Sequence, residues 1–210
     1  MPKRILIIKI FIIFLFALHP NAWALDFQLG VGALDISKSD ETSKESTFFP
    51  FVGLGGEMDS QLSVFLEVGT LGYEANVTGD EDLAKGSLNT TGTSTALIIA
   101  PQTENFVFRL GYGTILYKYN FEMDSGWDDI YELLGWDVTQ KLDDANGTQI
   151  ILGVDGKADP FFLGVEYRQI SVKPKATIGI KIPSENIDLE TTDEVDLSHT
   201  WMGIRFGLNF

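Results

Sequence analysis

Two neighbouring residues near the end of the chain, Ser198 and His199, have the types that nucleophilic catalysis uses. They could act as a nucleophile and its general base only if their side chains met. Both lie in an extended segment, where successive side chains point to opposite faces, so we expect them to lie apart. The other histidine is His19, and the chain has no cysteine. We therefore predict no catalysis, no metal site and no cofactor.

A second set of residues could form an electrostatic site, because charges stand on the polar side of segments that alternate between apolar and polar residues. These are Glu67, Arg109, Glu166, Arg168 and Arg205. Isolated buried charges carry a large desolvation cost, so we predict a mutual salt-bridge network. The network would fill and rigidify the interior of the fold. The alternative is a gate whose ion pairs re-partner to let water or small solutes pass.

The alternation that positions these charges is clearest in the last segment, from Thr200 to Phe210. Similar patterns predict eight strands, near 25–36, 46–58, 61–75, 91–101, 105–119, 147–156, 160–172 and 197–210. Short connections alternate with long ones, which are 37–46, 76–90, 120–146 and 173–196. This rhythm predicts one all-β domain of antiparallel, up-and-down strands.

The closing strand carries apolar residues on one face and ends on an aromatic residue: Met202, Ile204, Phe206, Leu208 and Phe210. It resembles the last strand of Gram-negative outer-membrane β-barrels, and the architecture resembles the small OmpA-, OmpX- and OmpW-like barrels. The resemblance implies an eight-stranded antiparallel up-and-down transmembrane β-barrel in the bacterial cell outer membrane. It also implies contact with outer-membrane lipid and lipopolysaccharide, and with the barrel-insertion machinery, for which Phe206, Leu208 and Phe210 would be the assembly signal. We expect a monomer.

A soluble eight-stranded barrel of the lipocalin kind is the alternative fold, with its apolar face turned inward. The polar faces here are rich in glycine, as in Gly111, Gly113 and Gly164, which suits a narrow lumen better than a surface in water. In the fourth strand the two faces do not separate by polarity, and we expect Leu97 and Ile99 to face lipid. Closure of the sheet would leave no unpaired edge in the bilayer.

The first 24 residues predict export. Lys3 and Arg4 precede an apolar run from 5 to 18, and Ala22 and Ala24 suit a signal peptidase. The run is shorter than the ~20 residues that a membrane-spanning helix needs. We expect a signal peptide at 1–24 and the barrel domain at 25–210. The formal net charge of −15 makes nucleic acid an implausible partner.

The third long connection predicts a short helix. Ser125 can cap it, Gly135 can end it, and one face would carry Trp127, Ile130, Tyr131 and Leu134. That face could rest on lipid, fold over the barrel mouth or bind a partner. The residues that lead into the helix, Tyr117, Tyr119 and Phe121, are expected in the aromatic girdle. Acidic groups such as 80–82 are expected to be solvated surface, with divalent cations shared with lipopolysaccharide as the alternative.

These observations favour an outer-membrane barrel with a structural or surface-interaction role and a lumen plugged by the charged network. The first alternative is a passive channel for small or apolar solutes, as in OmpW-like barrels. The second is an outer-membrane lipid-modifying enzyme, which the separation of Ser198 and His199 argues against.

Overall fold

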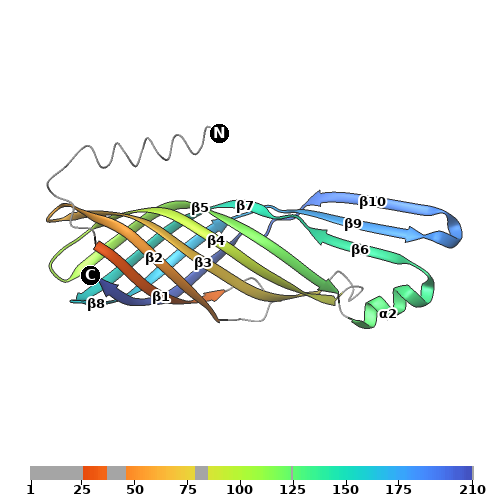
Figure 1. The fold of residues 1–210 in the computed structure, drawn as a ribbon, viewed down its shortest axis with the longest axis horizontal. Helices are drawn as coiled ribbons and strands as arrows, with labels where there is room; N and C mark the ends of the chain where they lie inside the picture. The colour runs from red at the N-terminus through yellow and green to blue at the C-terminus, as the bar shows by residue number, and fades with distance from the viewer. Residues whose placement is uncertain (1–25, 37–45, 79–84, 124, 210) are drawn as a thin grey trace, which may run out of the picture.

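A closed barrel of eight antiparallel strands forms the body of the molecule (Figure 1). The computed structural model describes residues 26–36, 46–78, 85–123 and 125–209. The predicted signal peptide therefore lies outside the described residues. The barrel strands are β1 (Asp26–Ile36), β2 (Ser46–Asp59), β3 (Leu62–Thr78), β4 (Lys85–Pro101), β5 (Phe106–Met123), β7 (Ala145–Ala158), β8 (Phe161–Ser171) and β11 (His199–Asn209). The predicted fold class and strand order are confirmed.

The first and last strands close the barrel. β1 pairs with β2 on one side and with β11 on the other, so that Gly30 lies opposite both Phe51 and Gly207. Each barrel strand thus has two hydrogen-bonded neighbours, and no row of backbone donors and acceptors is left open along the wall. This satisfies the main physical requirement for a sheet in lipid.

Apolar side chains point outward along the barrel and not into a central cavity. Exposed examples occur on β5 (Phe106, Phe108, Leu110) and on β11 (Met202, Ile204, Phe206). β4 shows the same arrangement, because Ile99 is 45% exposed while its neighbour Ile98 is fully buried. The prediction that Ile99 faces outward is confirmed, and the lipocalin-like alternative is wrong. Water would not tolerate so large an apolar surface, whereas a bilayer requires one.

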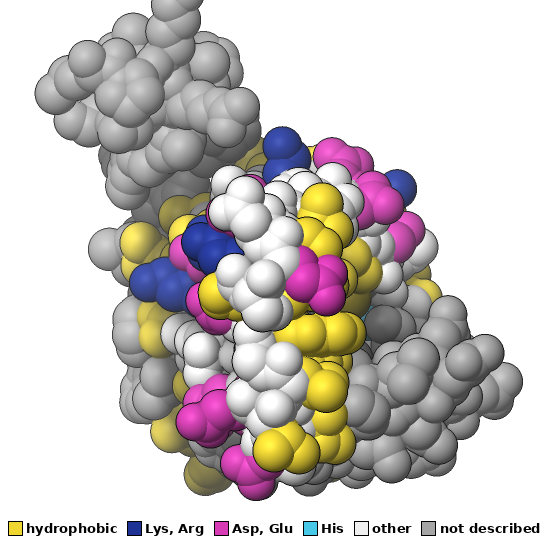
Figure 2. Space-filling view, turned by 90° about the vertical axis from the view of Figure 1, so that its right-hand side faces the viewer, with side chains coloured by type: hydrophobic (Ala, Val, Ile, Leu, Met, Phe, Trp, Pro, Cys, Tyr) yellow, Lys and Arg dark blue, Asp and Glu magenta, His cyan; other side chains and the backbone are white. Residues whose placement is uncertain are grey.

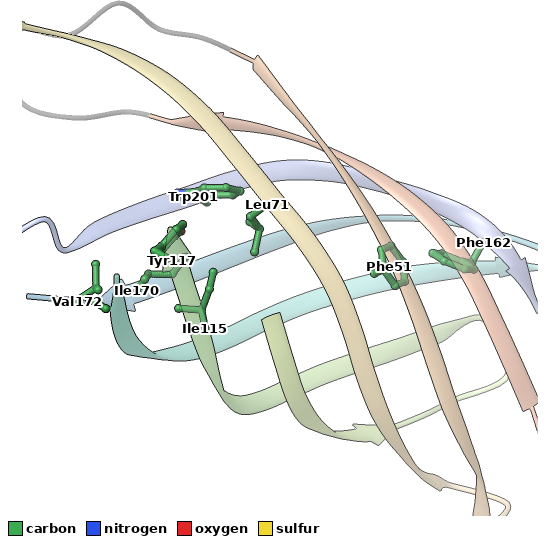
Figure 3. Close-up of a cluster of buried hydrophobic side chains, with 9 residues drawn as sticks. Phe51, Leu71, Ile115, Tyr117, Phe162, Ile170, Val172 and Trp201 are labelled. Atoms are coloured by element: carbon green, nitrogen blue, oxygen red, sulfur yellow. The ribbon is translucent and has the colours of Figure 1, made fainter. Parts of the chain in front are cut away.

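The lumen is filled by side chains in layers. One apolar cluster contains Phe65, Ile98 and Val107, near the short turns, and extends to Ile151 in the middle of β7. The other contains Leu71, Ile115, Tyr117 and Trp201 on the loop side, and extends to Phe51 and Phe162 (Figure 3). The glycines of the wall make this filling possible: at Gly113, a Cβ would meet the backbone of Thr95 and Ala96. The small residues of the wall thus leave space inside the narrow barrel for the buried side chains of both clusters.

Two of the connections expected as loops contain regular structure. The chain between β5 and β7 forms α2 (Ser125–Leu134) and β6 (Asp137–Leu142), and the chain between β8 and β11 forms β9 (Lys175–Ile182), a 3-10 turn η2 (Pro183–Glu185) and β10 (Ile187–Glu194). Strands β10, β9 and β6 make a second sheet that extends past one end of the barrel (Figure 1). The predicted helix is confirmed, and Gly135 ends it with a φ of 68°. The expectation of loops over the rest of these segments is wrong.

The connection predicted at 76–90 is shorter than expected. β3 continues to Thr78 and β4 begins at Lys85, and the two pair along this whole length. The sequence Gly86 to Thr93 lacks an apolar face, which is why the alternation missed it. Over the described residues, no helix is long and apolar enough to cross a membrane.

Candidate functional site

The charged residues predicted from the sequence meet in the middle of the lumen. Glu67 comes from β3, Arg109 from β5, Glu166 and Arg168 from β8, and Arg205 from β11. Each is at most 1% exposed. Alternation along each strand turns these side chains inward, and the closed wall brings four strands around one point.

Glu67 accepts hydrogen bonds from two arginines. Its Oε2 lies 2.5 Å from Nη2 of Arg109, and its Oε1 lies 2.5 Å from Nη2 of Arg168. Nη2 of Arg205 is 3.7 Å from the same carboxylate. One carboxylate on β3 is thereby tied to three other strands.

Glu166 repeats this arrangement from the opposite wall. Its Oε1 accepts from Nε of Arg168 at 2.5 Å, and its Oε2 lies 3.3 Å from Nε of Arg205 and 3.7 Å from Nε of Arg109. Each of the two glutamates therefore faces all three guanidinium groups. Alternating charges at these distances offset much of the desolvation cost that a single buried charge would carry.

A third carboxylate, which the sequence reasoning missed, completes the charge balance. Asp155 on β7 lies 3.2 Å from Nη1 of Arg205 and 3.9 Å from Nε of Arg109. Three acids then face three arginines. We call these six residues the lumen cluster: Glu67, Arg109, Asp155, Glu166, Arg168 and Arg205. The signal was available, because Asp155 is two residues from Gly153 and shares its inward face.

Neutral side chains extend the lumen cluster on two sides. Nη1 of Arg168 donates to Oε1 of Gln149 at 3.1 Å, and Nε2 of Gln149 donates to Oγ of Ser94 at 2.6 Å. The guanidinium of Arg205 lies 4.3 Å from the centre of the Phe51 ring. Polar bonds and a cation–π contact thus continue the network to β4, β7 and β2.

An aromatic group lies in the lumen on the side of the long connections. Tyr73, Tyr117, His199 and Trp201 stack edge to face or tilted, with ring centres 5.4–6.4 Å apart. Tyr117 is fully buried, so its predicted place in the outer girdle is wrong. It has the same parity as Arg109 on β5, and this parity, rather than residue type, sets its direction.

His199 belongs to this aromatic group, and its hydrogen-bond partners differ from those of Ser198. Its Nδ1 lies 2.8 Å from the carbonyl oxygen of Leu197, so Nδ1 donates there and Nε2 accepts from the hydroxyl of Tyr117 at 3.1 Å. Ser198 accepts instead from the backbone N–H of Val172 at 3.2 Å. The two side chains have separate partners, which is the arrangement predicted for neighbours on a strand.

The predicted surface residues take different positions. Ile130 and Leu134 of α2 are exposed, Tyr131 stacks on Trp136 with ring centres 6.3 Å apart, and the side chain of Trp127 lies outside the described residues. Of the predicted assembly signal, Phe206 points outward and Leu208 is half-buried, while Phe210 lies outside the described residues.

No metal site accompanies these features in the part of the chain that the structure describes: no three His, Asp or Glu residues are grouped as metal ligands would be. The acidic group at 80–82 is not among the described residues.

The sequence matches no family model and no curated protein. The fold, however, matches solved barrels. It superposes on the outer membrane protein OprG from Pseudomonas aeruginosa with a TM-score of 0.65 and 17% identity, over 90% of this chain and 98% of OprG.

Two further structures give the same picture. A major outer membrane protein from Thermus thermophilus has a TM-score of 0.57 at 11% identity, over 90% of this chain and 100% of its own. Ail of Yersinia pestis, in complex with the heparin analogue sucrose octasulfate, has a TM-score of 0.51 at 9% identity, also over 90% and 100%. Identities this low establish the fold alone. The chain has the fold of the small outer-membrane β-barrels.

Proposed function

We propose that this protein is an integral outer-membrane barrel whose lumen is closed by the lumen cluster and which acts through its extracellular surface. The observation that carries the proposal is that Glu67 and Glu166 each lie within 3.7 Å of all three arginines of the lumen. A continuous water path would have to separate these pairs and leave buried charges uncompensated.

Apolar layers support the same conclusion. Phe65 and Val107 pack on the short-turn side of the lumen cluster, and Tyr117 and Trp201 pack on the other side. Each layer excludes water from the charges between them. The parts of the molecule left free to meet partners are then outside the barrel, on the second sheet and on α2, where Trp127, Ile130, Tyr131 and Leu134 remain the proposed contact residues.

Planar-bilayer recording of the refolded protein tests the closed lumen. We expect no conductance steps from the wild-type barrel. Arg109→Ala and Glu67→Ala each remove one charge and leave the opposing charges to hydrate, so steps should appear. Gln169→Ala, next to Arg168 but on the outward face, is the matched control and should remain silent.

Steps from the wild-type protein would favour the passive channel instead. Heat-dependent mobility on gels should show that each variant still forms a barrel, so that silence reports a closed lumen and not an unfolded chain.

A further inference from the structure

The protruding sheet has two chemically different faces. Cross-strand pairs place Val138, Ile180 and Leu189 together, and Ile182 opposite Ile187. Residues paired directly across an antiparallel sheet share a face. The opposite face carries Thr139, Gly179 and Glu190, and beside them Lys181 opposite Asp188. We call the first of these the apolar face, and its large apolar residues are Val138, Ile178, Ile180, Ile182, Ile187 and Leu189.

The apolar face is left uncovered in the structure. Ile178 is 42% exposed and Leu189 is 63% exposed, although both lie in the middle of paired strands. None of its members belongs to either hydrophobic cluster of the lumen. A sheet beyond the membrane with one apolar face normally covers that face. An uncovered face of this kind marks a binding surface.

The apolar face begins at the barrel mouth. The register that pairs β8 with β11 continues without a slip into β9 and β10, through hydrogen bonds from Leu197 N to Val172 O and from Val195 N to Pro174 O. Val172 points into the lumen, so the residues at even spacing from it, Ile178 and Ile180, lie on the same side of the wall. The surface thus runs from the lumen-side aromatic group outward along the sheet.

A pocket of about 460 Å³ lies where β5 meets this sheet. Tyr119 and Phe121 line it from β5, Gln140 and Leu142 line it from β6, and two acids follow in the chain, Asp143 and Asp144. Gln140 and Leu142 pair with Ile178 and Ala176, so the pocket adjoins the apolar face. An occupant with an apolar side and a cationic group would meet both.

Charge determines which occupant fits. Between Ser125 and Asp144 there are six acids and one lysine, and between Lys173 and Asp196 there are six acids and three lysines. Lys141, Lys173 and Lys181 are already beside Asp143, Asp196 and Asp188. Figure 2 looks onto this end of the molecule, where apolar side chains lie alongside acidic ones. An anionic ligand or a second copy of this acidic chain would be repelled.

We propose that the apolar face binds a cationic amphipathic peptide, whose apolar side covers Ile178 and Leu189 and whose basic residues meet the surrounding acids. The proposal deepens the extracellular interaction role and rests on it. Apolar burial supplies affinity, while the acids supply selection and speed of encounter. Asp193, which pairs with Ala176 at the barrel end of the face, is the acid best placed to meet a bound lysine.

The test uses the full chain refolded in nanodiscs of zwitterionic lipid, with a fluorescent 18-residue peptide of leucine and lysine as the probe. Fluorescence anisotropy gives the Kd, and empty nanodiscs give the background. An otherwise identical peptide with glutamate in place of lysine tests charge. We expect the lysine peptide to bind, the glutamate peptide not to bind, and binding to weaken as salt rises.

Variants locate the site. Ile178→Ser with Leu189→Ser should weaken binding at least about tenfold, which corresponds to 1.4 kcal/mol. The matched control, Thr177→Ser with Thr192→Ser, changes the same two strands on the opposite face and should leave the Kd within about twofold. Asp193→Asn should weaken binding and reduce its salt dependence, because Asp193 pairs with Ala176 on the apolar face.

Three results of the binding assay would overturn the inference: no binding of the lysine peptide, equal binding of the glutamate peptide, or binding that the double serine variant leaves unchanged. Sedimentation that shows a dimer disrupted by Leu189→Ser would also overturn it, because the occupant would then be a second copy. The proposal that the lumen is closed is tested separately, because conductance steps from the wild-type barrel would contradict it. A silent barrel that binds no peptide contradicts this inference alone.

Discussion

Each arginine of the lumen cluster depends on more than one carboxylate, and this sharing decides what a substitution does. Arg168 is fully buried and donates to both Glu67 and Glu166. Removing it leaves two buried carboxylates with fewer partners. The stability lost on removing one partner of a buried ion pair exceeds the stability that the intact pair contributes, because the remaining charges stay buried without compensation.

We therefore predict that Arg168→Met lowers the free energy of unfolding by about 3–5 kcal/mol. Urea unfolding in micelles, followed by tryptophan fluorescence, measures the loss. Adding Glu166→Gln should recover part of it, since the cluster is then closer to neutral. Lys141→Met, at an exposed pair with Asp143, is the control and should change stability by at most about 1 kcal/mol. Equal effects of the two single variants would contradict the buried network.

Two glycines on neighbouring strands test how tightly the lumen is filled. At Gly164 a Cβ would meet Oδ1 of Asp155 and the carbonyl oxygen of Val154, whereas at Gly156 the nearest atom is the carbonyl oxygen of Leu163 at 3.5 Å. Gly164→Ala should therefore displace Asp155 from Arg205 and cost about 1–3 kcal/mol. Gly156→Ala should be close to neutral in the same unfolding measurement. A neutral Gly164→Ala would show that the lumen has spare room.

At the scale of single residues, the alternation of apolar and polar residues predicted well which side chains point into the barrel, and predicted less well which residues they contact there. It turned Glu67, Arg109 and Arg205 inward, because a period of two leaves a side chain only two directions. The parity of Asp155 with Gly153 indicated an inward direction, but which arginines it contacts depends on which strands face each other across the lumen. The prediction for Tyr117 was wrong because it rested on the aromatic residue type, whereas the position of Tyr117 at even spacing from Arg109 turns its side chain inward.

At the scale of elements, the barrel strands were predictable because most of them combine an outward apolar face with a turn at one end; β4, whose faces do not separate by polarity, was predicted too short. β6, β9 and β10 were not predicted, although Ala176, Ile178, Ile180 and Ile182 alternate as a strand does. The many acids around them favoured loops, and charge says little about pairing. These strands form because the antiparallel pairing of β8 with β11 continues beyond the barrel, in the same register, as the pairing of β9 with β10.

The β9–β10 hairpin should be dispensable for the barrel. Replacing residues 176–193 by Asn-Gly, a two-residue turn that suits a hairpin, leaves every barrel strand with both neighbours. We expect the shortened chain to refold into micelles with unchanged heat-dependent mobility, while β6 loses its only partner in the second sheet. Hydrogen exchange should show loss of protection confined to residues 137–142. Failure to refold would contradict the independence of the barrel from this hairpin.

At the scale of the whole molecule, exposed apolar residues divide into two populations that accessibility alone does not distinguish. Ile204 on β11 is 58% exposed, and Leu189 on β10 is 63% exposed. The barrel fold places the first against lipid, while the second lies on the protruding sheet in water. The medium, and not the exposed fraction, should therefore decide the cost of a charge at each position.

We predict that Ile204→Arg lowers stability in a lipid bilayer by up to about 2–4 kcal/mol, because the guanidinium must then sit in hydrocarbon or distort the bilayer around it. Leu189→Arg, at nearly equal exposure, should change stability by less than about 0.5 kcal/mol, as surface substitutions usually do. Reversible unfolding from phosphatidylcholine vesicles measures both. Equal losses of stability would mean that Ile204 and Leu189 lie in the same medium. The assignment of the barrel wall to lipid and of the second sheet to water would then be wrong.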